Sequence, residues 1–166
     1  QYDNKDPDDI NDIKTRSLEL LTNWNGHMVT GSPEPLIYST WVDTFIKMIL
    51  EDELSFDSLS ANTVSPLFLE KVLRNYKNAE AWCDIKHSDK IETCVELSEK
   101  SLTKSLRKLK EIYGSNVDSW RWGDERRINH PSFSVNGVLI PKFLQEISSE
   151  ISGSEHTLNS IMLRDL

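Results

Sequence analysis

The stretch that most strongly determines the fold is DKIETCVELSEKSLTKSLRKLKEIY, residues 89–113. Its apolar side chains recur at three- and four-residue steps, and its lysines and arginine occupy the opposite side. Gly114 follows directly, and glycine commonly ends helices because it adopts the left-handed cap conformation without a Cβ penalty. The pattern predicts a helix from about Asp89 to Tyr113. Its apolar face comprises Ile91, Val95, Leu102, Leu106, Leu109 and Tyr113.

Three more helices are predicted upstream of this stretch. The first has Asp8 or Asp9 as its cap, carries an apolar stripe and ends before Gly26. The second covers residues 37–49, where apolar side chains again recur at three- and four-residue steps. The third covers residues 66–76 and begins with a serine cap followed by a proline in the first turn. These segments predict a mainly α-helical protein.

The pattern changes after residue 123. Pro131, the Asn136-Gly137 pair and Pro141 would interrupt any long helix. Apolar and polar residues alternate over 133–140, which predicts short strands and one small hairpin. A last amphipathic helix is predicted over 143–151, ending at a Ser-Gly pair. We therefore expect a few short strands near the C-terminus of a mainly α chain.

The length and composition fit one globular domain. A chain of 166 residues can bury roughly 70% of its unfolded surface in one core. Its 37% hydrophobic and 28% charged residues are typical of a globular protein and exclude general disorder. We expect residues 1–166 to form a single helical unit. Residues 1–9 would be a flexible lead-in, residues 10–123 helical, and residues 124–166 turns, short strands and a helix.

The charge argues against two classes of partner. The net charge is −8, and an acidic chain repels the phosphate backbone that supplies most non-specific nucleic-acid affinity. No apolar run approaches the roughly 20 residues that a membrane-spanning helix needs. The opening QYDNKDPDDIND is acidic, whereas a signal peptide is basic and then apolar. We expect no nucleic-acid partner, no membrane contact and no export signal within this chain.

The sequence contains no clear catalytic or metal-binding pattern. Hydrolysis needs a nucleophile beside a base, or a metal with a free coordination position. His27, His87, His130 and His156 lie in separate segments with no metal-ligand spacing, which favours scattered surface histidines over a metal site. Ser152-Gly153-Ser154 lacks the spacing of a nucleophile elbow and predicts a turn. We assign no catalytic, cofactor-binding or metal-binding residue.

A basic face on the predicted helix 89–113 is a candidate interaction surface. It comprises Lys100, Lys104, Arg107, Lys108 and Lys110. These side chains could contact an anionic partner. A solvated face opposite an apolar stripe has the same pattern and is several times commoner.

Cys83 and Cys94 are the two cysteines of the chain, eleven positions apart. A loop that folds back along a helix can bring two Cα atoms within the roughly 4.4 to 6.8 Å that a disulfide needs. The alternative is two reduced, buried thiols that act as small apolar residues. The spacing of the two cysteines does not decide between a disulfide and two reduced thiols.

Several short motifs, taken in order, resemble the penicillin acylase (penicillin amidase) family. The resemblance spans about Ile10 to Asn159, and the order and spacing of the motifs carry it. The motifs are Asn23-Trp24-Asn25-Gly26, Ser32, Ile37-Tyr38-x-x-Trp41, Trp82-Cys83-Asp84, Glu92-Thr93-Cys94, Tyr113-Gly114, Trp120-Arg121-Trp122-Gly123 and His130-Pro131.

The resemblance implies an N-terminal-nucleophile hydrolase. In that family a precursor cuts itself to free a Ser at the N-terminus of its β chain, and the α-amino group of that Ser serves as the base. This chain matches a later part of the β chain, where helices lie beside the catalytic αββα sandwich. The nucleophile, the oxyanion-stabilising groups, the catalytic Asn and Arg, and the calcium ligands would all lie upstream. Gln1 has no hydroxyl or thiol and cannot replace the Ser.

Some positions follow the family and others depart from it. Many relatives have the Trp-Cys-Asp and Glu-Thr-Cys pair, so the resemblance favours a Cys83–Cys94 disulfide and an extracytoplasmic setting, where such bonds persist. Asn25 replaces the usual Asp, and Arg126 replaces a common His. Ser154-Glu155 stands where Gly-Asp usually precedes Thr157 and Asn159. These departures leave the substrate undefined.

Two functions follow as hypotheses. In the first, the chain is a structural, helical part of an acylase that hydrolyses linear amide bonds of the penicillin, cephalosporin or acyl-homoserine-lactone type. Its partners would be the α chain and the catalytic part of the β chain, and the parent would be periplasmic or extracellular. In the second, the chain is a self-standing interaction module that presents its basic face to an acidic partner.

Overall fold

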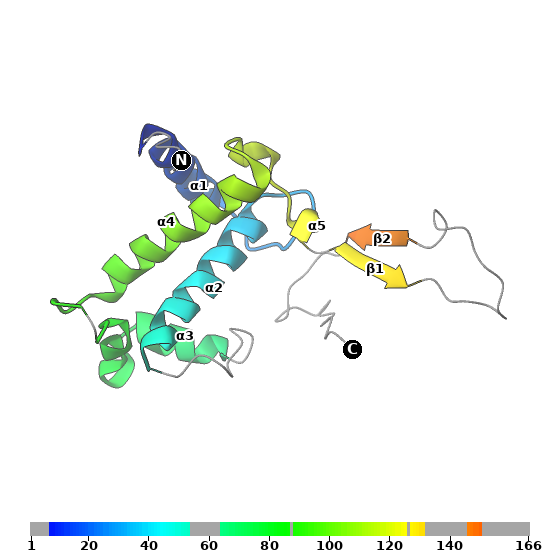
Figure 1. The fold of residues 1–166 in the computed structure, drawn as a ribbon. Helices are drawn as coiled ribbons and strands as arrows, with labels where there is room; N and C mark the ends of the chain where they lie inside the picture. The colour runs from blue at the N-terminus through cyan, green and yellow to red at the C-terminus, as the bar shows by residue number, and fades with distance from the viewer. Residues whose placement is uncertain (1–6, 54–63, 87, 126, 132–145, 151–166) are drawn as a thin grey trace.

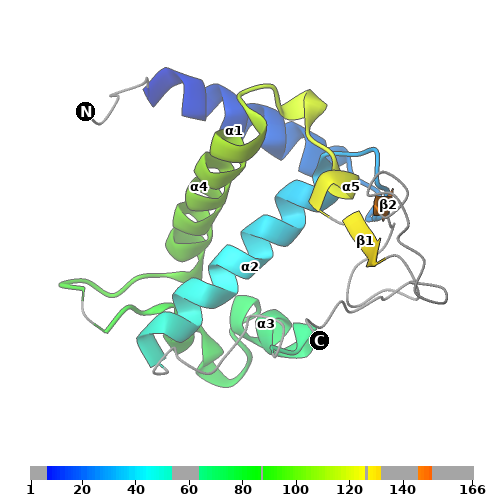
Figure 2. The same cartoon turned by 45° about the vertical axis from the view of Figure 1, so that its right-hand side comes forward.

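The computed structural model describes residues 7–53, 64–86, 88–125, 127–131 and 146–150. The described chain is mainly helical, as predicted. In both views α2 and α4 lie side by side, and α1 crosses the end of α4 that leads toward α5 (Figures 1 and 2). The elements are α1 (Pro7–Asn23), α2 (Glu34–Glu53), α3 (Pro66–Leu73), the 3-10 helix η3 (Tyr76–Cys83), α4 (Cys94–Tyr113), the 3-10 helix η4 (Val117–Ser119), α5 (Trp122–Glu125), β1 (Arg127–Pro131) and β2 (Glu146–Glu150).

Helix α4 begins at Cys94, five residues later than the predicted Asp89. Thr93 is its cap, because the Thr93 side chain accepts a hydrogen bond from the backbone N–H of Glu96, and the Glu96 side chain accepts one from the backbone N–H of Thr93. This reciprocal pair sets the first turn. Ile91 therefore lies before the helix and is 82% exposed, and Val95 in the first turn is 75% exposed. The prediction that Ile91 lies on the apolar face of the helix is wrong because Ile91 precedes the helix, and Val95 lies in the helix but outside the buried part of that face.

The apolar side chains form two core clusters along α2 and α4. The first core cluster lies where α1, α2, α4 and the segment around α5 meet. It comprises Ile13, Leu36, Ile37, Leu102, Leu106, Leu109, Val117, Trp120 and Trp122. The second core cluster lies where α3 and η3 pack against α2 and α4. It comprises Phe45, Ile49, Val72, Cys83, Cys94 and Leu97. The burial of Leu102, Leu106 and Leu109 confirms that part of the predicted apolar face.

The remaining helix ends differ modestly from the predictions. Helix α1 begins at Pro7, inside the predicted lead-in 1–9, since proline is already set for a first helical turn. It ends before Gly26, whose φ of +81° is the left-handed conformation that glycine adopts readily. Helix α3 has the predicted Ser65 cap but ends at Leu73 rather than at Tyr76. Asn75, Lys77 and Asn78 take positive φ values, so the backbone leaves the α-helical conformation after α3.

The strands β1 and β2 form an antiparallel pair, with Arg127 opposite Glu150 and Pro131 opposite Glu146. In a two-stranded ribbon both strands are edges, so Pro131 is tolerated although it cannot donate a ladder hydrogen bond. The helix predicted over 143–151 is wrong for residues 146–150, where backbone pairing with β1 gives a strand. The strands predicted over 133–140 lie outside the described residues.

Within the described part of the chain, no helix is both long enough and apolar enough to cross a membrane.

Candidate functional site

Cys83 and Cys94 join the end of η3 to the start of α4. The two residues are linked by a disulfide, and their Cα atoms lie 5.0 Å apart. Cys83 has no exposed surface, and Cys94 is 7% exposed. The bond lies inside the second core cluster, so it ties the loop 84–93 to a packed region rather than to a solvent-facing site.

Glu92 lies in that loop and is the one charged side chain that is buried among the described residues, with 4% of its surface exposed. Its carboxylate accepts hydrogen bonds from the Ile85 backbone N–H at 3.2 Å and from Ser88 Oγ at 2.9 Å. Lys100 Nζ on α4 lies 3.3 Å from the other carboxylate oxygen. Burial acts to raise the pKa of Glu92, but these hydrogen bonds and the charge of Lys100 outweigh it and lower the pKa below its usual value. Glu92 therefore fastens the loop to α4 as a carboxylate.

The tryptophans of the sequence motifs act as packing and hydrogen-bonding residues. The indole N–H of Trp41 donates to Ser98 O at 3.1 Å and to Ser101 Oγ at 3.0 Å, which connects α2 to α4. The indole N–H of Trp120 donates to Gly114 O at 3.0 Å, and Trp120 is 1% exposed. Trp82 meets Phe68 edge to face with ring centroids 5.1 Å apart. Each of these tryptophan rings therefore lies where two segments of the fold meet.

Backbone hydrogen bonds connect the motif around Trp122 to a loop that is distant in the sequence. The N–H of Trp122 donates to Ser32 O at 3.1 Å, and the N–H of Gly123 donates to Thr30 O at 2.9 Å. These bonds join the start of α5 to the loop between α1 and α2, which is about ninety residues away in the chain. These backbone hydrogen bonds thus bring together the motif residues Ser32, Trp122 and Gly123.

Two of the four histidines belong to described residues, and they lie in different segments of the fold. His27 lies in the exposed loop after α1, where its backbone N–H donates to Asn25 Oδ1. His130 lies in β1, whereas His87, His156 and Ser152-Gly153-Ser154 lie outside the described residues. In the described part of the chain, no three His, Cys, Asp or Glu side chains are arranged so that they could hold a metal ion.

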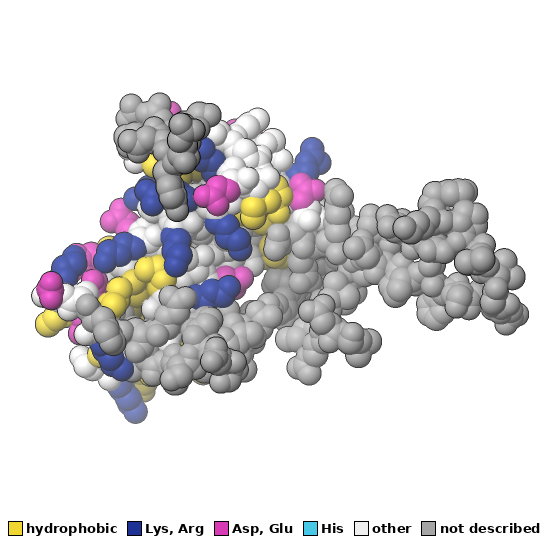
Figure 3. Space-filling model, in the orientation of Figure 1, with side chains coloured by type: hydrophobic (Ala, Val, Ile, Leu, Met, Phe, Trp, Pro, Cys, Tyr) yellow, Lys and Arg dark blue, Asp and Glu magenta, His cyan; other side chains and the backbone are white. Residues whose placement is uncertain are grey.

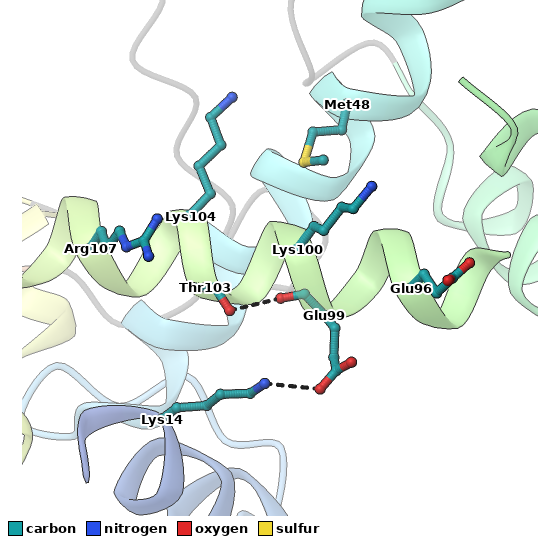
Figure 4. A pocket seen from close by; sticks show the side chains of 8 residues that line it. All are labelled: Lys14, Met48, Glu96, Glu99, Lys100, Thr103, Lys104 and Arg107. Carbon is teal, nitrogen blue, oxygen red and sulfur yellow. Dashed lines mark hydrogen bonds and ion pairs between the residues drawn. The ribbon is translucent and has the colours of Figure 1, made fainter. Parts of the chain in front are cut away.

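A shallow groove of about 580 Å³ follows the exposed side of α4. Figure 3 shows Lys and Arg side chains gathered over α4 on this face. Figure 4 shows α4 crossing the site, with Met48 of α2 on one side and Lys14 of α1 on the other. Three of the five predicted basic-face residues line the groove. Its lining residues are Lys14, Met48, Glu96, Glu99, Lys100, Thr103, Lys104 and Arg107.

The carboxylates of this α4 groove are already paired. Glu99 Oε1 lies 2.9 Å from Lys14 Nζ, an ion pair that joins α4 to α1. Glu96 Oε1 lies 2.9 Å from Lys90 Nζ. The Thr93 backbone N–H and then Lys90 lower the pKa of Glu96 to about 2, and Glu96 in turn raises the pKa of Lys90. Glu96 is therefore held in its charged form, and each of the two carboxylates forms an ion pair with a lysine.

The cations of the groove differ in their pairing. Lys100 contacts Glu92, and Lys14 contacts Glu99. Lys104 and Arg107 are exposed and form no ion pair with any described residue. The other two predicted residues point elsewhere, because Lys110 pairs with Asp9 and Lys108 does not line the groove. The sequence pattern offered no sign of Lys14 and Met48, which come from other helices.

Comparison with protein families gives one result. The family model described as penicillin amidase matches residues 4–164, which include every described element. No curated protein and no solved structure matches the chain.

Proposed function

Because the chain belongs to the penicillin amidase family, a family of hydrolases that act on carbon–nitrogen bonds, we propose that it is a helical part of the β chain of such an acylase. The parent enzyme hydrolyses linear amide bonds of the penicillin, cephalosporin or acyl-homoserine-lactone type. The observation that carries this proposal is the family match over residues 4–164. This chain contributes structure, and the Ser nucleophile comes from the catalytic part of the β chain.

The hydrogen bonds of three described serines support a structural role. An attacking hydroxyl must pass its proton to a positioned base. Instead, Ser101 Oγ donates to Ser98 O at 2.7 Å, Ser105 Oγ donates to Leu102 O at 2.8 Å, and Ser119 Oγ donates to Asn116 O at 2.7 Å. Backbone carbonyls accept these hydrogen bonds but do not act as bases. The Glu92 carboxylate, which accepts a hydrogen bond from Ser88 Oγ, is buried and also paired with Lys100. The tryptophans of the family motifs likewise serve at junctions between elements.

The partners and the location follow from the same proposal. The chain packs against the α chain and the catalytic part of the β chain, and the calcium associated with the family would bind residues outside this chain. We place the parent in the periplasm or outside the cell. The Cys83–Cys94 disulfide supports this location, since disulfides persist in oxidising compartments.

An activity comparison tests the proposal. The purified 166-residue chain and the full-length processed protein are each assayed with a chromogenic phenylacetyl amide and with a long-chain acyl-homoserine lactone. We expect turnover by the full-length protein and none by the chain alone, because the chain supplies no activated nucleophile.

The control is a full-length variant whose N-terminal β-chain Ser is replaced by Ala, which should be inactive. Turnover by the isolated chain would contradict the structural role. Failure of the full-length protein on all acyl amides would contradict the acylase assignment itself.

A further inference from the structure

We propose that the α4 groove binds an acidic, extended polypeptide segment of a partner protein, with the carboxylates of that segment paired to Lys104 and Arg107. This inference concerns binding and does not depend on the acylase assignment. It concerns a groove that takes no part in the proposed hydrolase role.

The first argument is the imbalance of charge within the groove. Lys14, Lys100, Lys104 and Arg107 line it, against the carboxylates of Glu96 and Glu99. Glu96 is paired with Lys90, which lies outside the groove lining, and Glu99 is paired with Lys14. Lys104 and Arg107 therefore form a cationic patch on a chain whose net charge is −8. An acidic ligand is the one whose charge complements this patch.

The second argument is the spacing of the cations along α4. Lys100, Lys104 and Arg107 follow one another at four- and three-residue steps, which place them on one helix face (Figure 4). A helix rises about 1.5 Å per residue, so Lys104 and Arg107, which form no ion pair with a described residue, are offset by about 4.5 Å along the axis. Alternate side chains of an extended peptide are about 6.6 Å apart and point the same way. The long side chains of Lys104 and Arg107 can cover the remaining difference of about 2 Å, so acidic side chains at alternate positions of an extended segment can pair with both cations.

The third argument separates a polypeptide from a nucleic acid. A phosphate backbone would approach the carboxylates of Glu96 and Glu99 as well as the cations, and it would meet the acidic remainder of the chain. A polypeptide can place carboxylates at Lys104 and Arg107, amide N–H groups near the Glu side chains and an apolar side chain on Met48. Because cations, carboxylates and a thioether line the groove together, it fits a polypeptide better than a nucleic acid.

The test measures binding of a short fluorescent peptide with Glu at alternate positions to the 166-residue chain by fluorescence anisotropy at low salt. We expect the double variant Lys104→Glu/Arg107→Glu to weaken the Kd by about tenfold or more, because two attractions become repulsions. The control matched in charge to each single variant, Lys104→Glu or Arg107→Glu, is Lys108→Glu, a charge reversal on the same helix at an exposed position outside the groove, which should weaken binding much less than either. The swapped variant Lys104→Arg/Arg107→Lys keeps the charges and should keep the affinity.

Far-UV circular dichroism confirms that each variant is folded, which is expected because both positions are exposed. Equal weakening by Lys108→Glu and by the single variants Lys104→Glu and Arg107→Glu would overturn the proposal, since binding would then follow net charge and not the groove. Absence of any binding at low salt would overturn it as well. Tighter binding of a single-stranded oligonucleotide with the same number of charges would assign the groove to nucleic acid and reject the polypeptide.

Discussion

Leu106 lies in the first core cluster, between helices that are distant in the sequence, and has no exposed surface. We expect Leu106→Ala to lower the free energy of unfolding by about 2 to 5 kcal/mol, because truncation removes buried apolar surface and leaves a cavity. Urea denaturation measures the loss. Ile112→Ala is the matched control on α4, since Ile112 is 57% exposed and its truncation should cost under about 0.5 kcal/mol. A loss at Leu106 no larger than that of the control would reject the assigned core.

Cys83 and Cys94 provide a second prediction for single residues. We expect unfolded, unreduced protein made under oxidising conditions to contain no titratable thiol, and two per chain after reduction. The Cys83→Ser/Cys94→Ser variant should lose about 2 to 3 kcal/mol of stability, because the unfolded chain is no longer restricted by a short closed loop. Ellman titration and urea denaturation measure these effects. Two reactive thiols without reductant would show that the bond does not form.

Among the elements, the N-terminus of α4 depends on ionised Glu96. Hydrogen bonding by the Thr93 N–H and the nearby Lys90 hold the pKa of Glu96 at about 2, below its usual 4.5. A carboxyl whose folded pKa is lowered stabilises the fold above its unfolded pKa and loses this contribution as the pH falls through the folded value. We therefore expect the cap to weaken between about pH 4.5 and pH 2. Thermal unfolding of the wild type and Glu96→Gln across this range measures the effect.

The Gln side chain of this variant can still accept the Thr93 N–H hydrogen bond but does not ionise. Its stability should therefore change less between these pH values than that of the wild type. Glu111→Gln removes one carboxylate from the other end of α4, where the described residues form no ion pair with Glu111, and should leave the acid profile nearly unchanged. Parallel profiles for the wild type and Glu96→Gln would show that the cap does not depend on this ionisation.

For the whole molecule, α2 and α4 each supply residues to both core clusters. Leu36 and Leu102 belong to the first core cluster, and Ile49 and Leu97 to the second. Because the same two helices join both clusters, we expect the described helices to unfold in one cooperative transition. Leu106→Ala and Ile49→Ala should each shift that single transition, with tryptophan fluorescence and far-UV circular dichroism giving the same midpoint. Two separate transitions would show that the clusters are independent.

Most of the helices could be predicted because the signals for them lie within short stretches of the sequence. Helices near α1, α2, α3 and α4 were predicted from apolar periodicity, and Ser65, Gly26 and Gly114 marked helix ends correctly. A helix end depends on a few neighbouring backbone groups, so its signal lies within a few residues. The late start of α4 was also present in the sequence, because Thr93 followed three residues later by Glu96 is a capping box.

The sequence by itself determined the helical class, the four main helices and the family, because these depend on local periodicity and on ordered motifs. Only the tertiary structure decided which tryptophans join which elements, and which strand pairs with residues 127–131. It also decided that Lys14 and Met48 share a groove with Lys104. These groups are brought together by packing between helices, and the contact between Lys14 and Glu99 crosses 85 positions of the chain. No periodicity along one segment records which face of a distant segment will pack against it.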